Sequence, residues 1–549
     1  MIDFQTDPSR YRHWRIETNG EVASLIMDVD EKGGMFEGYE LKLNSYDLSV
    51  DIELADAIQR LRFEHPEVKA VVLRSGKEKV FCAGANIRML AGAAHSHKVN
   101  FCKFTNETRN SMEDASHFSG QQYISAVKGA CAGGGYELAL ASEYIILTDD
   151  GSSSVSLPEV PLLAVLPGTG GLTRVTDKRK VRRDLADVFC SIEEGVKGKK
   201  AVDWRLVDET VSNSRFEEAV AAKTSALVKA SSRPSGQTGI KLGPLNRSIT
   251  DDAVSYSTLQ VEIDRAAGVA TITVKGPDDT PPASAGEMVA QGDGFWPLRA
   301  ARELDDAILH LRLNEMEVGV IQFKTVGDSA RVVAYDNFLE AQADHWLGRE
   351  ILLYWRRVLK RVDLTSRSLV ALIEPGSCFA GTLTELVWAC DRSYMALGAF
   401  EGDNRPPATL LLSAANFGRH PMSNGLTRLQ TRFLGDPDSV AQAESRLGEE
   451  ISGEDAEKLG LVTFAYDDID WDDEVRMFLE ERTSFSPDAL TGMEANLRFA
   501  GPETMETRIF GRLTAWQNWI FQRPNAVGQD GALRRYGSGQ KADYNMERV

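Results

Sequence analysis

The chain has 549 residues, of which 42% are hydrophobic and 26% charged, and its formal net charge is −19. A chain of this length and composition can bury a sizeable core and is expected to form roughly two to four domains. The acidic balance disfavours nucleic acid or an anionic membrane as the main partner, because both bind clustered Lys and Arg, although a local basic patch can still hold an anionic ligand.

The cysteines and the amino-terminal residues indicate the cellular compartment in which the protein is expected. The six cysteines form no CxxC pair and no regular framework, so neither a structural zinc site nor a disulfide scaffold is indicated. Residues 1–14 lack the apolar stretch of a signal peptide, and no apolar run reaches the ~18 residues that span a bilayer. We therefore expect a cytoplasmic protein with no metal and no membrane partner.

Two long segments of the chain repeat each other. ELADAIQRLRFEHPEVKAVVLRS, starting at Glu53, matches ELDDAILHLRLNEMEVGVIQFKT, starting at Glu303. Each reads as an amphipathic helix that runs into a short strand, at 70–73 or at 318–321. Similar pairs flank them: GEVASLIMDV resembles GVATITVKG, and YELALASEYIIL resembles TELVWACDRSYMAL. This collinear series predicts a tandem duplication.

The duplication predicts the domain organisation. We expect halves of residues 1–255 and 256–480, joined by a linker rich in Ser, Gly and Pro at 231–248. Strands alternate with helices, so each half should be a layered α/β unit with parallel pairing. The tail, 481–549, predicts an amphipathic helix over 505–520. That helix either docks on a core or subunit surface or, alternatively, covers an active site.

Three glycine-rich or turn-like segments follow predicted strands in the first half. They are VFCAGANIRML (80–90), KGACAGGGYELALA (128–141) and SLPEVPLLAVLPGTGGLTR (156–174). Three glycines before a helix let the backbone approach a ligand closely, and the first free N–H groups of the helix point towards that ligand. Such an arrangement stabilises a developing oxyanion, and the small residues at 83–86 allow a second donor.

Each segment taken alone has a plainer interpretation. A triple glycine is commonly a simple turn. Glu137 in a first helical turn is explained as a partner of the helix dipole, and Glu159 after Pro158 as a solvated loop residue. His95 and His97 form an HxH pair, but no third ligand is spaced to complete a metal site, so we expect loop histidines.

Together, the three segments resemble the signature series of the crotonase (enoyl-CoA hydratase/isomerase) superfamily in their order and spacing. The resemblance covers residues 15–210, including GKKAVDWRLVDE at 198–209. It implies the α/β class with tandem crotonase-like (ββα spiral) domains, followed by a C-terminal helical segment. It also implies an enzyme that acts on a small-molecule acyl-CoA thioester and needs no cofactor beyond the coenzyme A of the substrate.

The resemblance carries over to individual positions. Ala85 and Gly134 match the two residues whose backbone N–H groups bind the thioester oxygen. Glu137 and Glu159 match the two glutamates that activate water or move protons in the hydratases. Arg88 stands where the hydratases usually carry a lysine near the coenzyme A moiety.

Further positions follow from the same resemblance. Asn86 replaces the usual aspartate, which should leave the oxyanion-hole backbone unaffected. Ala83, Gly133 and Pro158 adjoin the matched positions and are candidates for substrate binding. Cys102 lies in a region that walls the acyl pocket of relatives and is therefore a candidate pocket residue, with a plain buried cysteine as the alternative.

The second half departs from the pattern at the reactive positions. GGG becomes GTL at 381–383, AGAN becomes AYDN at 334–337, and PGTGGLTR becomes HPMSNGLTR at 420–428. Glu385 remains opposite Glu137. We expect the second copy to be degenerate, with a structural or interface role and no second active site.

The duplicated halves, the glutamate pair and the ending at 522–545 resemble a group of ring-opening lyases within the superfamily. That group cleaves 2,3-epoxybenzoyl-CoA hydrolytically during aerobic benzoate degradation and releases formate and 3,4-didehydroadipyl-CoA semialdehyde. A conventional enoyl-CoA hydratase or isomerase and a catalytically silent acyl-CoA-binding protein stay open as alternatives. Because an internal repeat can satisfy part of an oligomer interface within one chain, we expect a homodimer.

Overall fold

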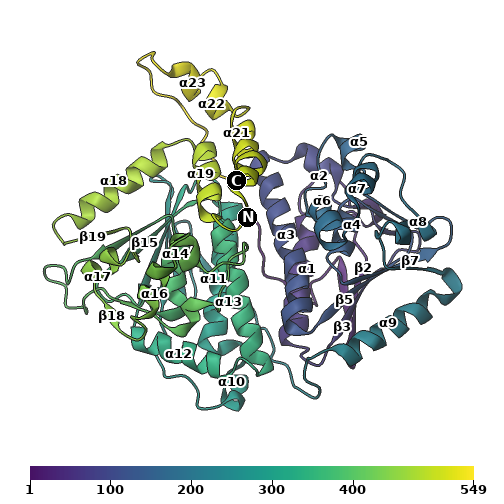
Figure 1. Cartoon of the computed structure of the whole chain (residues 1–549), viewed down its shortest axis with the longest axis horizontal. Coiled ribbons are helices and arrows are strands. Elements are labelled where there is room, and N and C mark those ends of the chain that lie inside the picture. Colours follow the sequence, from purple (N-terminus) through teal and green to yellow (C-terminus); the bar gives the residue numbers. More distant parts are fainter. The chain divides into compact units, whose positions relative to one another are not determined.

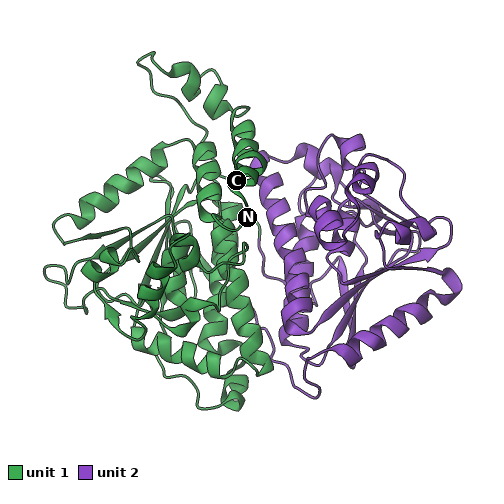
Figure 2. Cartoon of the chain, viewed as in Figure 1, with its two compact units in different colours: residues 1–2, 245–549 green, residues 3–244 purple.

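The computed structural model describes residues 1–549 and divides the chain into two compact units (Figure 2). The N-terminal unit contains residues 3–244, and the C-terminal unit contains residues 1–2 and 245–549. The division falls inside the stretch 231–248, whose composition predicts a linker. The further separation of residues 481–549 stays a prediction.

The N-terminal unit is built on a six-stranded sheet with the order β1-β2-β3-β5-β7-β9, in which only β1 is antiparallel to its neighbour. A smaller parallel sheet has the order β4-β6-β8. The parallel pairing agrees with the prediction from alternating strands and helices. The strands are β1 (Trp14–Asn19), β2 (Val22–Met27), β3 (Ala70–Ser75), β4 (Val80–Cys82), β5 (Gln122–Val127), β6 (Ala130–Ala132), β7 (Tyr144–Asp149), β8 (Ser154–Ser156) and β9 (Glu209–Ser212).

Helices cover the large sheet of this unit, with α9 along one side and α1 and α3 along the other (Figure 1). Part of the core lies between β3, β5, β7 and α9, where Val72, Ile124 and Ile146 pack with Phe216 and Val220. The helices and helical turns are η1 (Lys42–Asn44), α1 (Leu48–Phe63), α2 (Ile87–Gly92), α3 (His95–Asp114), η2 (Ala115–Ser119), α4 (Gly134–Leu140), α5 (Glu159–Leu163), α6 (Gly171–Thr173), η3 (Arg174–Lys178), α7 (Arg183–Cys190), α8 (Gly198–Asp203), η4 (Asn213–Arg215) and α9 (Phe216–Ala230).

Helix α1 illustrates how the sequence dictates these elements. It begins after Asp47, whose side chain accepts a hydrogen bond from the Ser49 amide and so caps the helix. Leu54, Ile58 and Leu61 are buried on one face, as their helical spacing predicts. The helix and the strand that follows it, β3, confirm the interpretation of the first repeated segment.

The C-terminal unit contains an eight-stranded sheet with the order β10-β11-β12-β13-β14-β15-β16-β19, in which the pairs from β13 onward are parallel. As in the N-terminal unit, an antiparallel pair, here β12-β13, leads into a parallel series. The strands are β10 (Ser248–Ile249), β11 (Ala253–Ser255), β12 (Leu259–Asp264), β13 (Val269–Lys275), β14 (Val320–Val326), β15 (Ser368–Ile373), β16 (Arg392–Ala396), β17 (Leu410–Leu411), β18 (Glu450–Ile451) and β19 (Phe464–Tyr466).

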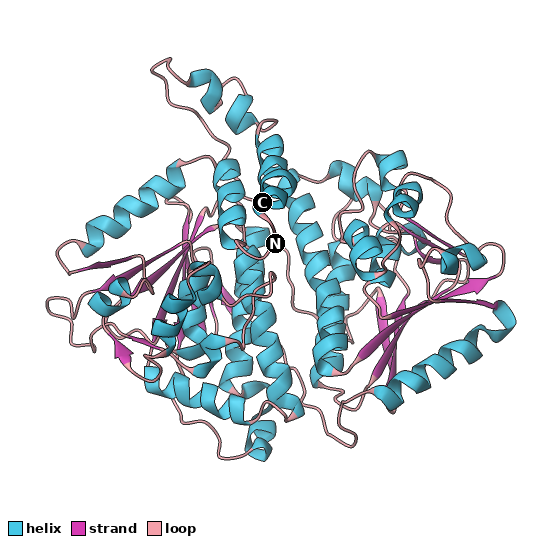
Figure 3. Ribbon diagram, in the orientation of Figure 1, coloured by secondary structure: helices cyan, strands magenta, loops and turns pink.

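Helices are abundant in the C-terminal unit, and its last residues form no further strand (Figure 3). No helix of the chain combines the length and the apolar character needed to cross a bilayer. The helices and helical turns are α10 (Ala285–Gln291), η5 (Gly292–Gly294), α11 (Trp296–Asn314), α12 (Ser329–Ala341), α13 (Trp346–Leu364), η6 (Gly381–Leu383), α14 (Thr384–Ala389), η7 (Ala414–Phe417), α15 (Arg428–Arg432), α16 (Pro437–Glu444), α17 (Gly453–Lys458), α18 (Trp471–Ser484), α19 (Pro487–Arg498), α20 (Met505–Arg508), η8 (Ile509–Leu513), α21 (Thr514–Ile520), α22 (Pro524–Val527) and α23 (Ala532–Arg535).

The tail differs from its prediction in one respect. The helix predicted over 505–520 is present and continuous, but it contains the π-helical turn Ile509–Leu513 between α20 and α21. A π-turn widens the helix locally by one residue, so it shifts the apolar face of α21 relative to that of α20.

Candidate active site

Three short strands bring the predicted site segments together. β4 ends at Cys82, β6 at Ala132 and β8 at Ser156, and these strands pair in parallel in the order β4-β6-β8. The segments AGAN, GGG and LPE follow the three strands directly. Because the carboxyl ends of parallel strands meet at one edge of a sheet, the three segments converge there.

The first turn presents the Ala85 amide. Gly84 adopts a φ of +91°, a conformation that residues with a side chain rarely take. The Tyr46 amide donates to the Gly84 carbonyl at 3.0 Å, and the Asn86 amide donates to the Tyr46 carbonyl at 2.8 Å. In this parallel bridge the N–H of Ala85 points away from Tyr46, and it makes no hydrogen bond within the protein.

The second turn presents the Gly134 amide at the start of α4. Gly133 adopts a φ of +53°, and its own amide donates to the Ser156 carbonyl at 2.9 Å. A Cβ on Gly84 would lie 2.8 Å from the Gly134 nitrogen, so the two turns are in direct contact. Like the Ala85 amide, the Gly134 amide has no acceptor within the protein. Two unused donors therefore lie close together.

Glu137 is held firmly in the first turn of α4. Its side chain is buried and accepts hydrogen bonds from the Gly171 amide, at 2.8 Å, and from the Thr169 hydroxyl. A Cβ on Gly171 would lie 2.7 Å from Oε1 of Glu137, so only glycine leaves room for the carboxylate at this position. The PGTGG segment therefore fixes the orientation of the Glu137 carboxylate.

Glu159 has a very different environment. It follows Pro158 at the start of α5, and its Oε1 lies over Gly133, where an added Cβ would be 2.9 Å away. Its Oε2 is buried and has no hydrogen-bond partner. Burial, together with the nearby charge of Glu137, raises the pKa of Glu159 to about 7. This carboxyl can therefore gain or lose a proton near neutral pH.

Two cysteines adjoin the carboxylates. Cys102, on α3, is partly buried, and burial followed by the charge of Glu137 raises the pKa of its thiol to about 11. Cys190, at the end of α7, is buried, and burial followed by the charge of Glu159 likewise raises the pKa of its thiol to about 11. Both side chains therefore remain neutral thiols near the pair of glutamates.

The other predicted positions surround this centre. Ala83 is exposed at the end of β4, and Arg88 is exposed on α2. The Asn86 side chain accepts from the Met89 amide at 3.0 Å and caps α2, so asparagine serves in place of the usual aspartate. His95 and His97 lie in the first turn of α3. No group of three His, Cys, Asp or Glu side chains is arranged to hold a metal ion.

The sequence alone does not identify several residues of this site. Thr169 and Gly171 belong to the PGTGG segment, which contributed to the resemblance, but no role was inferred for them. Cys190 and Tyr46 lie far from the three segments in sequence, and no local pattern marks them. They reach the site only through the tertiary fold.

The comparisons with known proteins agree with this geometry. The profile of the enoyl-CoA hydratase/isomerase family matches residues 40–239. A benzoyl-CoA-dihydrodiol lyase from Aromatoleum evansii is 56% identical over 549 residues, which cover 100% of this chain and 98% of that protein. The chain belongs to the family of this lyase, within the crotonase superfamily.

More distant members of the superfamily match only part of the chain. The fatty acid oxidation complex subunit alpha of Aliivibrio fischeri is 28% identical over 238 residues, which are 42% of this chain and 31% of that protein. A crystal structure of an enoyl-CoA hydratase from Geobacillus kaustophilus HTA426 has 28% identity and a TM-score of 0.35, covering 40% of this chain and 75% of that chain.

In the C-terminal unit, the positions that the sequence repeat pairs with Ala85 and Gly134 are hydrogen-bonded to each other. Asp336, paired with Ala85, accepts from the Thr382 amide at 2.7 Å and from the Thr382 hydroxyl at 2.8 Å. Thr382 is paired with Gly134, so the amide that corresponds to the second donor is bound to the protein's own carboxylate. Glu385 is buried and paired with Arg428 at 3.0 Å.

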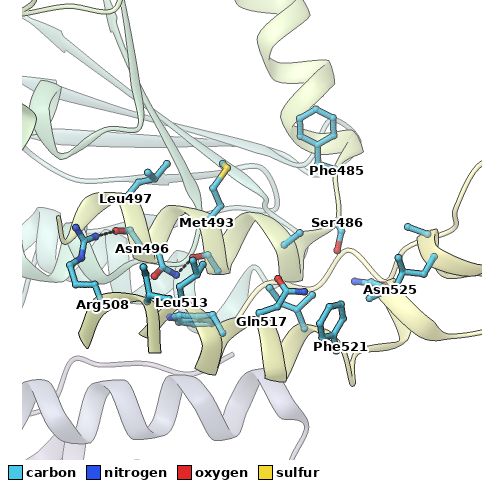
Figure 4. Close-up of a pocket in the computed structure, with 18 of the residues that line it drawn as sticks. Phe485, Ser486, Met493, Asn496, Leu497, Arg508, Leu513, Gln517, Phe521 and Asn525 are labelled. Atoms are coloured by element: carbon cyan, nitrogen blue, oxygen red, sulfur yellow. Dashed lines mark hydrogen bonds between the residues drawn. The ribbon is translucent and has the colours of Figure 1, made fainter. Parts of the chain in front are cut away.

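The C-terminal unit also contains a cavity of about 950 Å³ (Figure 4), and neither Asp336, Thr382 nor Glu385 lines it. It is mainly apolar and is lined by residues between 434 and 544, including Met493 and Leu497 of α19 and Leu513 of the π-turn. None of the predicted catalytic or binding residues lines this cavity.

We expect Glu159→Gln to stabilise the protein above about pH 7 and to have no effect below about pH 4.5. The pKa of Glu159 is higher in the folded protein, at about 7, than its ordinary value of 4.5. Folding is therefore favoured by the neutral carboxyl, and this stability is lost as the pH rises from 4.5 to 7. The gain in the variant should approach about 3 kcal/mol, measured by denaturant unfolding across this pH range. The exposed Glu193→Gln is the control, and a difference that does not change with pH would contradict the assignment.

We expect Asp336→Ala to lower the stability of the chain by about 2 kcal/mol, because the Thr382 amide loses its acceptor. Turnover by the folded variant should equal that of the wild type. Urea unfolding and a steady-state assay at a temperature where both proteins are folded measure the two effects. Asn337→Ala, at the exposed neighbouring position, should change the stability by less than ~0.5 kcal/mol. Equal stability of the two variants would show that the Asp336 carboxylate has no such role.

Proposed function

We propose that this chain is a ring-opening lyase that hydrolyses 2,3-epoxybenzoyl-CoA to formate and 3,4-didehydroadipyl-CoA semialdehyde. The observation that carries the proposal is the combination of two free amides with two carboxylates in unequal environments. The substrate is inferred from the name of the full-length relative and from the resemblance to ring-opening members of the superfamily. The atoms balance with two molecules of water and with no oxidant or reductant. The scheme therefore uses no cofactor beyond the coenzyme A of the substrate.

The two amides would bind the thioester oxygen. As a carbon–carbon bond next to the ring position that carries the thioester breaks, negative charge moves onto this oxygen. Donors that are already oriented stabilise this charge without reorganising, and loss of one such donor typically raises a barrier by ~3–4 kcal/mol. In this scheme the Ala85 and Gly134 N–H groups are those donors.

The unequal environments suggest different tasks for the two carboxylates. Glu137, fixed by Thr169 and Gly171, would hold a water molecule in a defined direction for attack. Glu159, with no hydrogen-bond partner on Oε2 and a pKa raised to about 7, would exchange protons with the substrate and water. Cys102 and Cys190 would form the wall beside them.

Other parts of the chain have supporting tasks in this proposal. Arg88, exposed on α2, is available to a phosphate of coenzyme A. The C-terminal unit is a degenerate crotonase-like copy that serves as scaffold, since its corresponding amide is bound by Asp336. The compartment is the cytoplasm, which agrees with the presence of six free cysteines.

Purified protein supplied with enzymatically generated 2,3-epoxybenzoyl-CoA should release formate. We expect Glu137→Gln and Glu159→Gln each to lower kcat at least about 100-fold, because each removes a group that holds water or transfers a proton. Formate release and the semialdehyde product are measured together. Glu193→Gln, an exposed position on the loop before α8, is the matched control and should retain full activity.

Hydration of crotonyl-CoA without formate release would contradict the ring-opening reaction and favour a conventional hydratase. Tight binding of coenzyme A esters without turnover would favour a binding protein instead. Formate release that survives both glutamine variants would remove the two carboxylates from the mechanism.

We further propose that the chain forms a homodimer through its C-terminal helices. Apolar side chains of this segment are strongly exposed, with Met505 at 75% and Phe510 at 73%. They lie on α20 and the π-turn that follows it, near the apolar cavity of the same segment. Large apolar side chains exposed close together on a surface commonly mark a protein interface.

We expect the double variant Met505→Asp, Phe510→Asp to be monomeric at concentrations where the wild type is dimeric, because burying two carboxylates in an apolar interface is costly. Sedimentation velocity measures the change. Ile469→Asp is the control, since Ile469 is 82% exposed but lies before α18, outside this segment. A wild-type monomer, or a variant that stays dimeric, would show that this surface is not the interface.

A further inference from the structure

Tyr46 connects the two turns that carry the free amides. Its backbone forms a parallel bridge with Ala85, through the hydrogen bonds to Gly84 and Asn86 described above. Its side chain reaches the second turn, where a Cβ on Gly134 would lie 2.0 Å from the Tyr46 hydroxyl and 2.8 Å from its Cζ. One residue therefore contacts the first turn with its backbone and the second turn with the end of its side chain.

The ring of Tyr46 contacts two residues of α3. The ring of Phe101 lies 5.9 Å away, centroid to centroid, and the guanidinium of Arg109 lies 5.3 Å from the Tyr46 centroid. Arg109 is itself fixed by Asp51 at 3.4 Å and by the Thr105 carbonyl at 3.1 Å. Because Phe101, Thr105 and Arg109 are four residues apart on one helix, they share a face.

The Tyr46 hydroxyl has no hydrogen-bond partner although the side chain is only 1% exposed. A buried hydroxyl without a partner lowers the stability of the folded state relative to a phenyl ring at the same position. The hydroxyl therefore makes no evident contribution to folding. What the hydroxyl does contact is Gly134, the residue that carries the second free amide.

We propose that Tyr46 is a positioning residue of the oxyanion hole, which sets the separation between the Ala85 and Gly134 amides. This inference rests on the proposed function of those two amides. Tyr46 acts as a spacer of fixed length: its backbone anchors one donor and its hydroxyl limits the approach of the other. Misplacement of a donor by a fraction of an ångström weakens the hydrogen bonds formed in the transition state more than it weakens the binding of the substrate.

The decisive variant is Tyr46→Phe, which keeps the ring but removes the atom that contacts Gly134. We expect a melting temperature equal to or above that of the wild type, because the deleted hydroxyl has no partner. We expect kcat for formate release to fall about tenfold with KM changed less than about twofold. Tyr123→Phe, a buried tyrosine of β5 outside the site, is the matched control and should retain both constants.

A second measurement reports the oxyanion hole without turnover. The absorption band of 4-(dimethylamino)cinnamoyl-CoA moves to longer wavelength when hydrogen bonds polarise its thioester carbonyl. We expect a clear red shift with the wild type and with Tyr123→Phe, and a smaller red shift with Tyr46→Phe at saturating protein. A residue that served only the stability of the fold would not change this shift.

The outcomes separate this inference from the proposed reaction. A red shift and a kcat equal to wild type in Tyr46→Phe would overturn the positioning role, as would losses of activity and melting temperature in parallel. If the wild type releases no formate but shifts the probe, the ring-opening reaction fails, and the smaller shift in Tyr46→Phe still supports the positioning role. If the wild type does not shift the bound probe, the oxyanion-hole assignment fails, and the inference fails with it.

Discussion

The hydrogen bond from the Gly133 amide to the Ser156 carbonyl joins the end of β6 to the end of β8 at 2.9 Å. It holds the triple-glycine turn beside the segment that carries Glu159, while contact between Gly84 and Gly134 holds the same turn beside the end of β4. Three segments separated by about fifty and twenty-five residues thus meet because their strands pair in parallel. Every functional proposal for the N-terminal unit depends on this convergence.

The convergence of the three segments also brings Glu137 and Glu159 into one site, where their electrostatic environments differ. When two carboxylates lie near each other in a poorly hydrated site, burial and mutual repulsion disfavour having both ionised. Local hydrogen bonds then determine which of the two has its pKa raised. Glu137 receives two hydrogen bonds, whereas Oε2 of Glu159 receives none. Glu159 is therefore the carboxyl whose pKa is raised, to about 7. Two identical side chains thus have different hydrogen bonding and different surroundings.

Periodicity and motif order made much of this fold predictable. The helix from Glu53 and its repeat from Glu303 are present, since apolar spacing reflects the face that must be buried. The candidate site was predictable because its three segments are each continuous in sequence. Tyr46 and Cys190 were not, since their approach depends on how α1, α3 and α7 pack. The π-turn at 509–513, inside the predicted helix of 505–520, was not predictable because it changes the register of a helix without a strong compositional signal.

In the C-terminal unit, the positions that the sequence repeat pairs with Ala85 and Gly134 have a different local structure, with Asp336 inside α12 and Thr382 in the helical turn η6. An oxyanion hole is useful only while its amides lack protein acceptors, and such unpaired donors lower the stability of the fold. In the C-terminal unit, the Asp336 carboxylate accepts hydrogen bonds from the Thr382 amide and hydroxyl. Glu385 is likewise paired, with Arg428. The Thr382 amide, unlike the Gly134 amide, is therefore hydrogen-bonded within the protein. In the N-terminal unit the Ala85 and Gly134 amides have no acceptor within the protein, which lowers the stability of the fold and leaves both donors available to an acceptor from outside it.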